Sequence, residues 1–182
     1  MKVQVTQENL NRALGAVARV ANTRNALPIL ANVLVKTVDN RLCLSATNLD
    51  IAISYFTGAK VETEGSITVP ARLMQDFVGS LPGGVINLKL EENKLHVNTD
   101  QYKSTINGIA ADDFPTLPAI DDGKTWTLPA ADFKKALQQV LFAASSDESR
   151  PVLTGVYLHT EGGRLYMAAT DSYRLAEKDL GA

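Results

Sequence analysis

The chain has 182 residues, with 18 Lys and Arg against 20 Asp and Glu, which gives a formal charge of −2. Hydrophobic residues make up 45% and charged residues 21%, an ordinary globular composition that excludes a disordered chain. The slight acidity excludes a basic protein that coats nucleic acid by charge alone. At roughly 150 residues per domain, the chain is longer than one domain, but the excess is too short for a usual second domain.

The single cysteine, Cys43, excludes an intrachain disulfide. It lies in an alternating apolar stretch, which predicts a small buried side chain rather than a reactive thiol. The N-terminus lacks the long apolar segment of a signal peptide. No run of 18 apolar residues occurs, so no membrane-spanning helix is expected. We therefore expect a cytoplasmic protein.

An internal repeat organises the chain. With an offset of 123 residues, 12 of the 50 positions in Val3–Ala52 are identical to those in Trp126–Leu175, where chance would give roughly three. A weaker copy lies between them, at an offset of 64. Each copy predicts the order strand–helix–strand–strand–strand, over about 60 residues.

The first copy opens with a short alternating strand, after which Thr6 is expected to cap a helix. Apolar residues then recur at helical spacing from Leu10 to Ala21, and a loop at 22–25 ends that helix. Asp39-Asn40 is typical of a hairpin turn. The strands of this copy are expected over 3–5, 30–37, 41–46 and 51–56.

The other two copies follow the same order. In the middle copy, Met74, Phe77, Val78 and Leu81 mark a helix that Pro82-Gly83-Gly84 ends. Its strands are expected over 85–90, 94–98 and 103–109. In the third copy, Pro129 suits the first turn of a helix whose apolar face is Phe133, Ala136, Leu137 and Val140. A hairpin over 152–160 and 164–170 is expected around Gly162-Gly163.

These copies predict an α+β fold in which helices pack on antiparallel sheets. A solenoid would need shorter repeats, so a domain duplication is favoured over it. No nucleophile elbow or Gly-rich phosphate loop occurs. His96 and His159 lie far apart and, with one cysteine, do not have the spacing of a metal site. We expect no catalytic residue, no metal and no cofactor.

Acidic pairs fall in turns or linkers, where they are usually only solvated. Those pairs are Glu91/Glu92, Asp112/Asp113, Asp121/Asp122 and Asp147/Glu148. The expected helices, in contrast, carry net positive charge. Their basic residues are Arg12, Arg19, Arg72, Lys134 and Lys135, against three acidic residues. Two interpretations stay open here: ordinary polar helix faces, or a weakly positive surface that holds a polyanion without reading bases.

Five short sequence segments resemble the N-terminal portion of the bacterial DNA polymerase III β subunits, the β sliding clamp family. Each string alone is weak, but their order on a strand–helix duplication is specific. They are Leu27-Pro28-Ile29-Leu30, Ala46-Thr47-Asn48-Leu49-Asp50, Val69-Pro70-Ala71-Arg72-Leu73-Met74, Asp113-Phe114-Pro115-Thr116-Leu117-Pro118 and Ala169-Thr170-Asp171-Ser172-Tyr173-Arg174-Leu175-Ala176.

The resemblance implies a DNA clamp fold of three similar domains, each built from two of the repeated copies. Two subunits would form a ring that encircles duplex DNA, with helices lining the hole, and that tethers the polymerase without catalysis of its own. Such a ring holds DNA mainly by enclosing it, which reconciles a DNA protein with a slightly acidic chain. Implied partners are double-stranded DNA, the DNA polymerase III alpha subunit, the clamp loader and other clamp-binding-motif proteins.

The resemblance also implies three sets of site residues. The loop arginine Arg24 matches a DNA-contacting position, and Arg150, in the equivalent loop of the third copy, aligns near other such positions. The helix charges add Arg12, Arg19 and Lys134. A cleft that captures short peptides would use Leu153, Thr170, Tyr173, Arg174 and Leu175. Tyr173 stands where some relatives have histidine, so partner preference stays open. The ring interface would use an exposed strand over 103–109, with Leu73, Ser104 and Ile106.

The implied domain boundaries are 1–120 for a two-copy first domain, 121–125 for a linker and 126–182 for the first half of a second domain. A third domain is absent, so we expect that this chain does not close a ring. The unpaired sheet edge of the half-domain predicts self-association. A peptide-binding module and an enzyme of an unrecognised α+β fold remain alternatives.

Overall fold

The computed structural model describes residues 1–21, 27–116 and 125–181. The chain divides into two units, unit 1 (Met1–Ala119) and unit 2 (Ile120–Ala182). The helices and strands of unit 1 are β1 (Lys2–Thr6), α1 (Gln7–Val17), β2 (Asn32–Val38), β3 (Arg41–Thr47), β4 (Ala52–Gly58), β5 (Lys60–Thr63), β6 (Ser66–Pro70), α2 (Ala71–Ser80), β7 (Val85–Glu91), β8 (Lys94–Asn98) and β9 (Lys103–Asn107). Those of unit 2 are α3 (Ala130–Val140), β10 (Tyr157–Glu161), β11 (Arg164–Thr170) and β12 (Leu175–Asp179).

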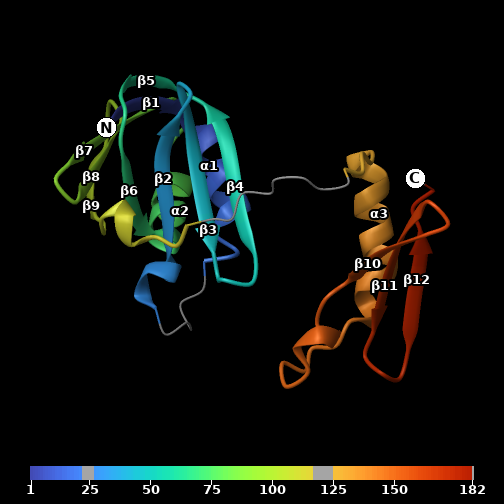
Figure 1. The fold of residues 1–182 in the computed structure, drawn as a ribbon. Helices are drawn as coiled ribbons and strands as arrows, with labels where there is room; N and C mark the ends of the chain where they lie inside the picture. The colour runs from blue at the N-terminus through green and yellow to red at the C-terminus, as the bar shows by residue number, and fades with distance from the viewer. Residues whose placement is uncertain (22–26, 117–124, 182) are drawn as a thin grey trace. The chain divides into compact units, whose positions relative to one another are not determined.

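Unit 1 contains two antiparallel sheets, with the strand orders β5-β1-β7-β8-β9 and β4-β3-β2-β6. The helices α1 and α2 pack against each other, and Figure 1 shows them together beside the sheets. Apolar side chains from both sheets and both helices meet in one core. Leu14, Val35, Met74 and Leu88, one from each of these four parts, are fully buried.

The two copies within unit 1 exchange their first strands. β1 begins the first copy but pairs with β7 of the second, with Thr6 opposite Val85. β6 begins the second copy but pairs with β2 of the first, with Asn32 opposite Pro70. Each sheet therefore depends on a strand from the other copy, and the two copies fold as one unit.

The strongest local signals of the sequence are confirmed. Thr6 caps α1, since its hydroxyl oxygen accepts a hydrogen bond from the N–H of Asn9 at 3.3 Å. Asp39 and Asn40 have φ of 49° and 58°, the left-handed conformation that a two-residue hairpin turn requires. Cys43 is buried in β3, as its apolar neighbours predict.

Several element boundaries in unit 1 differ from the sequence-based expectation. α1 ends at Val17 rather than near Ala21, because the chain turns there and the N–H of Val20 donates to the carbonyl of Val17. The strand expected from residue 30 begins at Asn32, since Pro28–Ala31 forms a 3-10 turn. The strand expected to reach residue 109 ends at Asn107. The short strand β5 was not expected at all.

Unit 2 contains the helix α3 packed on the sheet β10-β11-β12 (Figure 1). The predicted apolar face of α3 is confirmed: Ala136 and Val140 are buried, and Phe133 and Leu137 pack against them. The β10–β11 turn falls at Gly162-Gly163, both with positive φ, as predicted. The core of unit 2 is small, with five buried residues, Ala136, Val140, Ala143, Met167 and Ala169.

Two expectations for the third copy are wrong. Its first strand does not form, since residues 125–129 carry no strand pairing among the described residues. In unit 1 the equivalent strand β1 is held between β5 and β7, and unit 2 has no described counterpart of β7. The hairpin strand expected from Val152 begins at Tyr157, because Pro151–Leu153 forms a 3-10 turn.

The architecture of both units is α+β with antiparallel sheets, as the sequence predicts. Within the described ranges, no helix combines the length and the apolar character needed to cross a bilayer.

A glycine in unit 1 offers a test of the contact between β6 and the chain beyond β9. Thr68 and Ile109 form an isolated antiparallel bridge, and a Cβ on Gly108 would overlap the Thr68 carbonyl and the Ile67 side chain. We expect Gly108→Ala to destabilise unit 1 by about 1–3 kcal/mol, because buried main chain cannot move away. Urea unfolding measures this decrease in stability.

Gly58→Ala is the matched control, because no heavy atom lies within 4 Å of its added Cβ. It should leave the unfolding midpoint unchanged or raise it slightly. Equal destabilisation by Gly58→Ala and Gly108→Ala would contradict the packing argument.

Candidate functional site

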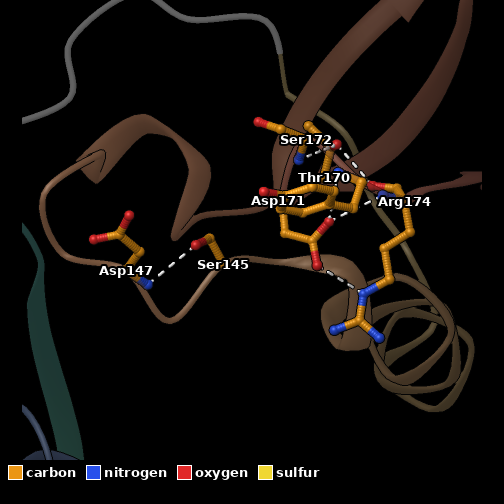
Figure 2. A network of polar contacts seen from close by, with 7 residues as sticks. Ser145, Asp147, Thr170, Asp171, Ser172 and Arg174 are labelled. Carbon is orange, nitrogen blue, oxygen red and sulfur yellow. Dashed lines mark hydrogen bonds and ion pairs between the residues drawn. The ribbon is translucent and has the colours of Figure 1, made fainter.

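The turn between β11 and β12 is organised by two short polar side chains (Figure 2). The Thr170 hydroxyl donates to the carbonyl of Arg174 at 2.7 Å and accepts from the N–H of Ser172 at 3.1 Å. Oδ1 of Asp171 accepts from the N–H groups of Tyr173 and Arg174, both at 2.9 Å. These bonds fix the end of β11 and the start of β12.

The exposed side chain of Arg174 also bonds to this turn. Its Nε donates to Oδ2 of Asp171 at 2.9 Å, and its guanidinium carbon lies 5.6 Å from the ring centroid of Phe142. The pKa of the Asp171 carboxyl is lowered, chiefly by the N–H groups of Tyr173 and Arg174 and further by the Arg174 guanidinium. The ionised carboxylate therefore stabilises the turn.

A second loop, over residues 145–150, is tied to the same turn. The Asp147 N–H donates to the Ser145 hydroxyl at 3.0 Å (Figure 2), and the Asp147 carboxylate accepts from the hydroxyl and N–H of Ser149. The hydroxyl and N–H of Ser149, and then the Arg150 guanidinium, lower the pKa of the Asp147 carboxyl. Arg150 donates from Nε to Asp147 at 3.2 Å and from Nη1 to Ser172 at 3.2 Å. Its guanidinium thus links the two loops.

A groove of about 190 Å³ with a largely apolar lining lies between residues 152–155 and the strands β10, β11 and β12. Three of the five predicted cleft residues line it, namely Leu153, Thr170 and Leu175. Tyr173, which is 94% exposed, and Arg174 do not. Five lining residues were missed by the sequence analysis, Val152, Gly155, Tyr157, Ala168 and Ala169.

Large apolar side chains at this groove are open to solvent. Val152 is 87% exposed and Leu175 is 69% exposed, although both are aliphatic. Leu153 is partly buried among them. Apolar side chains gathered on a surface and rimmed by polar groups are typical of a site that docks another molecule.

Unit 1 repeats the same turn at the equivalent place. The Thr47 hydroxyl donates to the carbonyl of Ile51 at 2.9 Å, and Oδ1 of Asn48 accepts from the N–H groups of Asp50 and Ile51. Leu49 has φ of 79°, as Ser172 does in unit 2. The internal repeat therefore extends to individual hydrogen bonds, and the alignment of Thr47-Asn48 with Thr170-Asp171 was the signal that could have identified Asp171.

The predicted DNA-binding residues are on the surface where the structure describes them. Arg12 forms an exposed ion pair with Glu8 at 2.7 Å, and Arg19 is exposed just beyond α1. Lys134 is exposed on α3. Arg24 lies outside the described residues. The others divide between unit 1 (Arg12, Arg19) and unit 2 (Lys134, Arg150).

The predicted ring-interface residues lie on α2 and on β9, the outer strand of its sheet. Leu73 is an exposed apolar side chain, and Ser104 is half-buried. Ile106 is only 3% exposed and belongs to the core. The expectation of an exposed strand is therefore wrong for the Ile106 side chain, because side chains alternate along β9 and this one faces inward. Only its main chain is available at the edge.

The enzyme alternative would be favoured by a pocket that gathers titratable groups with shifted pKa values. A depression of about 380 Å³ in unit 2 is lined by charged residues that include Asp132, Lys135, Arg164, Lys178 and Asp179. Among the described residues, the carboxyls with a lowered pKa lie elsewhere, at Glu62, Glu91, Asp147 and Asp171. No metal-ligand cluster occurs in the part of the chain that the structure describes.

Two family models match nearly the whole chain. The N-terminal domain of the DNA polymerase III beta subunit matches residues 1–118, and its central domain matches residues 127–182. The chain belongs to the DNA polymerase III beta subunit family. The recognition made from the five sequence strings is confirmed, and so is the clamp fold.

Individual relatives agree with this assignment. The beta sliding clamp of Synechocystis is 39% identical over 185 residues, which cover 97% of this chain and 47% of that protein. The Bacillus subtilis sliding clamp structure superposes with a TM-score of 0.91 at 28% identity, covering 98% of this chain and 50% of that one. A Bartonella birtlesii sliding clamp bound to griselimycin gives 0.90 at 32% identity, covering 100% and 50%. The chain spans about half the length of the relatives it matches.

Two substitutions of Asp171 separate its charge from its hydrogen bonds. Asp171→Asn keeps an oxygen that accepts from the turn N–H groups, as Asn48 does in unit 1, whereas Asp171→Ala removes it. We expect both variants to lower the denaturation midpoint of unit 2 at pH 7, Asp171→Ala more. Because the folded pKa lies below the unfolded value of about 3.9, the contribution of the charge is full above that pH and is lost as the pH falls through the folded pKa.

The midpoint difference between wild type and Asp171→Asn should therefore close on acidification below about pH 4. The difference between Asp171→Asn and Asp171→Ala should not change with pH. Circular dichroism during urea unfolding between pH 7 and pH 3 measures both. A constant gap between wild type and Asp171→Asn over this range would contradict the assignment.

Proposed function

We propose that the chain is the N-terminal portion of a beta sliding clamp of the bacterial replicase. In its full-length form, a homodimeric ring would encircle duplex DNA, slide along it and tether DNA polymerase III and other factors. It would act as a processivity subunit in the cytoplasm, with no catalysis of its own. The observation that carries this proposal is the match of two consecutive beta subunit domains across a chain built from repeated strand–helix copies.

Within this proposal, residues 1–120 form clamp domain 1 from two copies, 121–125 link the domains, and 126–182 supply the first half of clamp domain 2. The support is the exchange of first strands in unit 1. Because β1 pairs within the second copy and β6 within the first, two copies are needed for each first strand to find a partner. Unit 2 contains one copy, and its small core fits half of such a domain.

Exposed basic side chains would hold the DNA by its phosphates. Arg12, Arg19 and Lys134 lie on or beside helices and face solvent, and Arg150 lies on a loop. The Arg12 ion pair with Glu8 is exposed, and such pairs are weak enough to exchange for a phosphate. Phosphate contacts carry no base information, which suits a protein that slides.

A double variant tests the phosphate contacts. We expect Arg19→Ala with Lys134→Ala to weaken binding to a short duplex equally for two unrelated sequences. The slope of log K against log salt should fall by about 0.9 for each phosphate that is no longer neutralised, or about 1.8 in total. Fluorescence anisotropy over a salt series measures it.

Arg164→Ala is the control for this experiment, because Arg164 is an exposed cation whose guanidinium pairs with Asp179 at 2.6 Å on the sheet of unit 2. It should leave the slope nearly unchanged. Equal slopes for the wild type and the double variant would rule out the helix charges as the groups that bind DNA.

The groove of unit 2 would capture a short peptide from the polymerase alpha subunit, the clamp loader or another partner. Leu153 and Leu175 would act as apolar anchors, and Thr170 would contribute to the rim. Tyr173 and Arg174 stand beside the groove, where Arg174 would act by holding the turn that positions Leu175.

Alanine substitution tests the anchors. We expect Leu175→Ala to weaken binding of a labelled alpha-subunit clamp-motif peptide by about 30-fold, because truncation of an anchor costs about 2 kcal/mol. Ile51→Ala is the matched control, since Ile51 is a similarly exposed aliphatic residue of unit 1. Titration by fluorescence anisotropy measures both, and equal affinities for wild type and Leu175→Ala would argue against this groove.

The third set of residues would form one side of the ring contact. The main chain along the outer edge of β9 and the exposed Leu73 side chain on α2 are the support for this role. Ser104 would contribute from the same strand, and Ile106 only through its main chain.

A further inference from the structure

The outward face of the sheet β5-β1-β7-β8-β9 is positively charged, although the chain is slightly negative. Side chains alternate along these strands, so Val3, Leu88 and Val97 point into the core and their neighbours point away from it. Five lysines and two glutamates face outward, which gives +3 on a chain of −2. All five strands lie within residues 1–118, which the N-terminal domain model of the family matches. The lysines are Lys2, Lys60, Lys89, Lys94 and Lys103.

One row of outward side chains crosses all five strands in register. Gln4 of β1 lies opposite Lys60 of β5 on one side and opposite Asn87 of β7 on the other. Asn98 of β8 lies opposite Asn87, and Lys103 of β9 lies opposite Asn98. Three carboxamides thus stand in line between two lysines. At about 4.8 Å between neighbouring strands, this row is about 19 Å long.

The polar groups of this row are not engaged by other parts of the described structure. Lys60 and Lys103 form no ion pair among the described residues, and the three carboxamides form no hydrogen bond there. The row contains no carboxylate. Lysine ammonium groups and carboxamide NH₂ groups are all hydrogen-bond donors, so the row can donate to the oxygens of an anion that lies across the strands.

The two glutamates of the face neutralise lysines outside this row. Lys2 and Lys89 lie directly opposite each other on β1 and β7, an arrangement of like charges that destabilises a sheet. Glu62 pairs with Lys2 at 2.7 Å, and Glu91 pairs with Lys89. The hydrogen bonds from these two lysines lower the pKa of both carboxyls. The positive charge at the two ends of the row is left uncompensated.

The residue types of the face favour a nucleic acid over an acidic protein. Protein interfaces are enriched in Arg and aromatic residues and depleted in Lys, whereas the outward positions of these five strands hold Lys and no Arg, Tyr, Trp or Phe. Phosphate oxygens, in contrast, are commonly contacted by Lys, Asn and Gln side chains. A single strand would also need aromatic side chains on which its bases stack. The face therefore suits the backbone of a duplex.

We propose that this face, along the row from Lys60 to Lys103, binds the phosphate backbone of a duplex DNA segment without reading its sequence. Val3 and Leu88 point from the other side of the same sheet into the core that contains α1 and α2. The face is therefore turned away from both helices. The inference goes beyond the proposed function, in which charges on or beside the helices hold the DNA, because it assigns a second DNA surface to unit 1.

Binding of a short labelled duplex to the 182-residue protein over a salt series tests the face. Lys60→Gln and Lys103→Gln should each lower the slope of log K against log salt by about 0.9, because each removes one phosphate contact. Lys36→Gln is the matched control, since Lys36 is an exposed lysine on β2 of the other sheet, and it should leave the slope unchanged. Slopes that stay at the wild-type value in both row variants overturn the proposal.

Chemical labelling separates this face from the helices without any substitution. The wild-type protein is acetylated with and without the duplex, and the modified lysines are identified by mass spectrometry. Lys60 and Lys103 should react more slowly when the duplex is bound, and Lys36 should react at the same rate. Protection of Lys134 without protection of Lys60 and Lys103 overturns this inference and leaves the proposed function intact.

Competition in the Arg19→Ala, Lys134→Ala background tests the class of partner, because the binding that remains reports this face. An unlabelled duplex of unrelated sequence should displace the labelled one. A polyglutamate peptide of the same charge should displace it poorly, since the face offers a peptide no apolar or Arg anchor. Equal displacement by polyglutamate overturns the assignment to nucleic acid, and tighter binding of a single strand of the same length overturns the assignment to a duplex.

Discussion

A strand holds its place only when its main-chain groups find partners, and in unit 1 each first strand finds them in the other copy. β1 is held in the sheet of the second copy by β7, and β6 is held in the sheet of the first copy by β2. The two helices and the single core follow from this exchange, because it places both sheets against the same pair of helices. In the described part of unit 2 the equivalent segment, residues 125–129, pairs with no strand.

The groove of unit 2 does not depend on that exchange. Its rim is made by the turn after β11, where Asp171 and Thr170 bind main-chain groups no more than four residues away. Unit 1 forms the same turn with Thr47 and Asn48. A site built from such local bonds needs no pairing with distant segments, which is why the turn after β11 positions the start of β12 at Leu175.

Features that depend on neighbouring residues could be predicted from the sequence, whereas strands that depend on pairing with distant segments could not. The Thr6 cap and the Asp39-Asn40 turn were predicted correctly because each depends on neighbouring residues only. The missing strand at 125–129 and the late start of β10 were not predicted, since both depend on partners elsewhere. In the groove, Leu153 and Leu175 followed from resemblance, whereas Tyr157 and Ala168 enter it through the register of β10 and β11, which no local pattern reveals.

The pairing of β1 with β7 also has a consequence for biosynthesis. Thr6 and Val85 lie opposite each other although 79 residues separate them in the chain. At a synthesis rate of about 5–20 residues per second, β1 is made roughly 4–16 s before its partner. During that interval α1 and the hairpin β2–β3 can form from local contacts, while the main chain of β1 has no β7 to pair with. The N-terminal segment is therefore the earliest part of the domain to be made and among the last to fold.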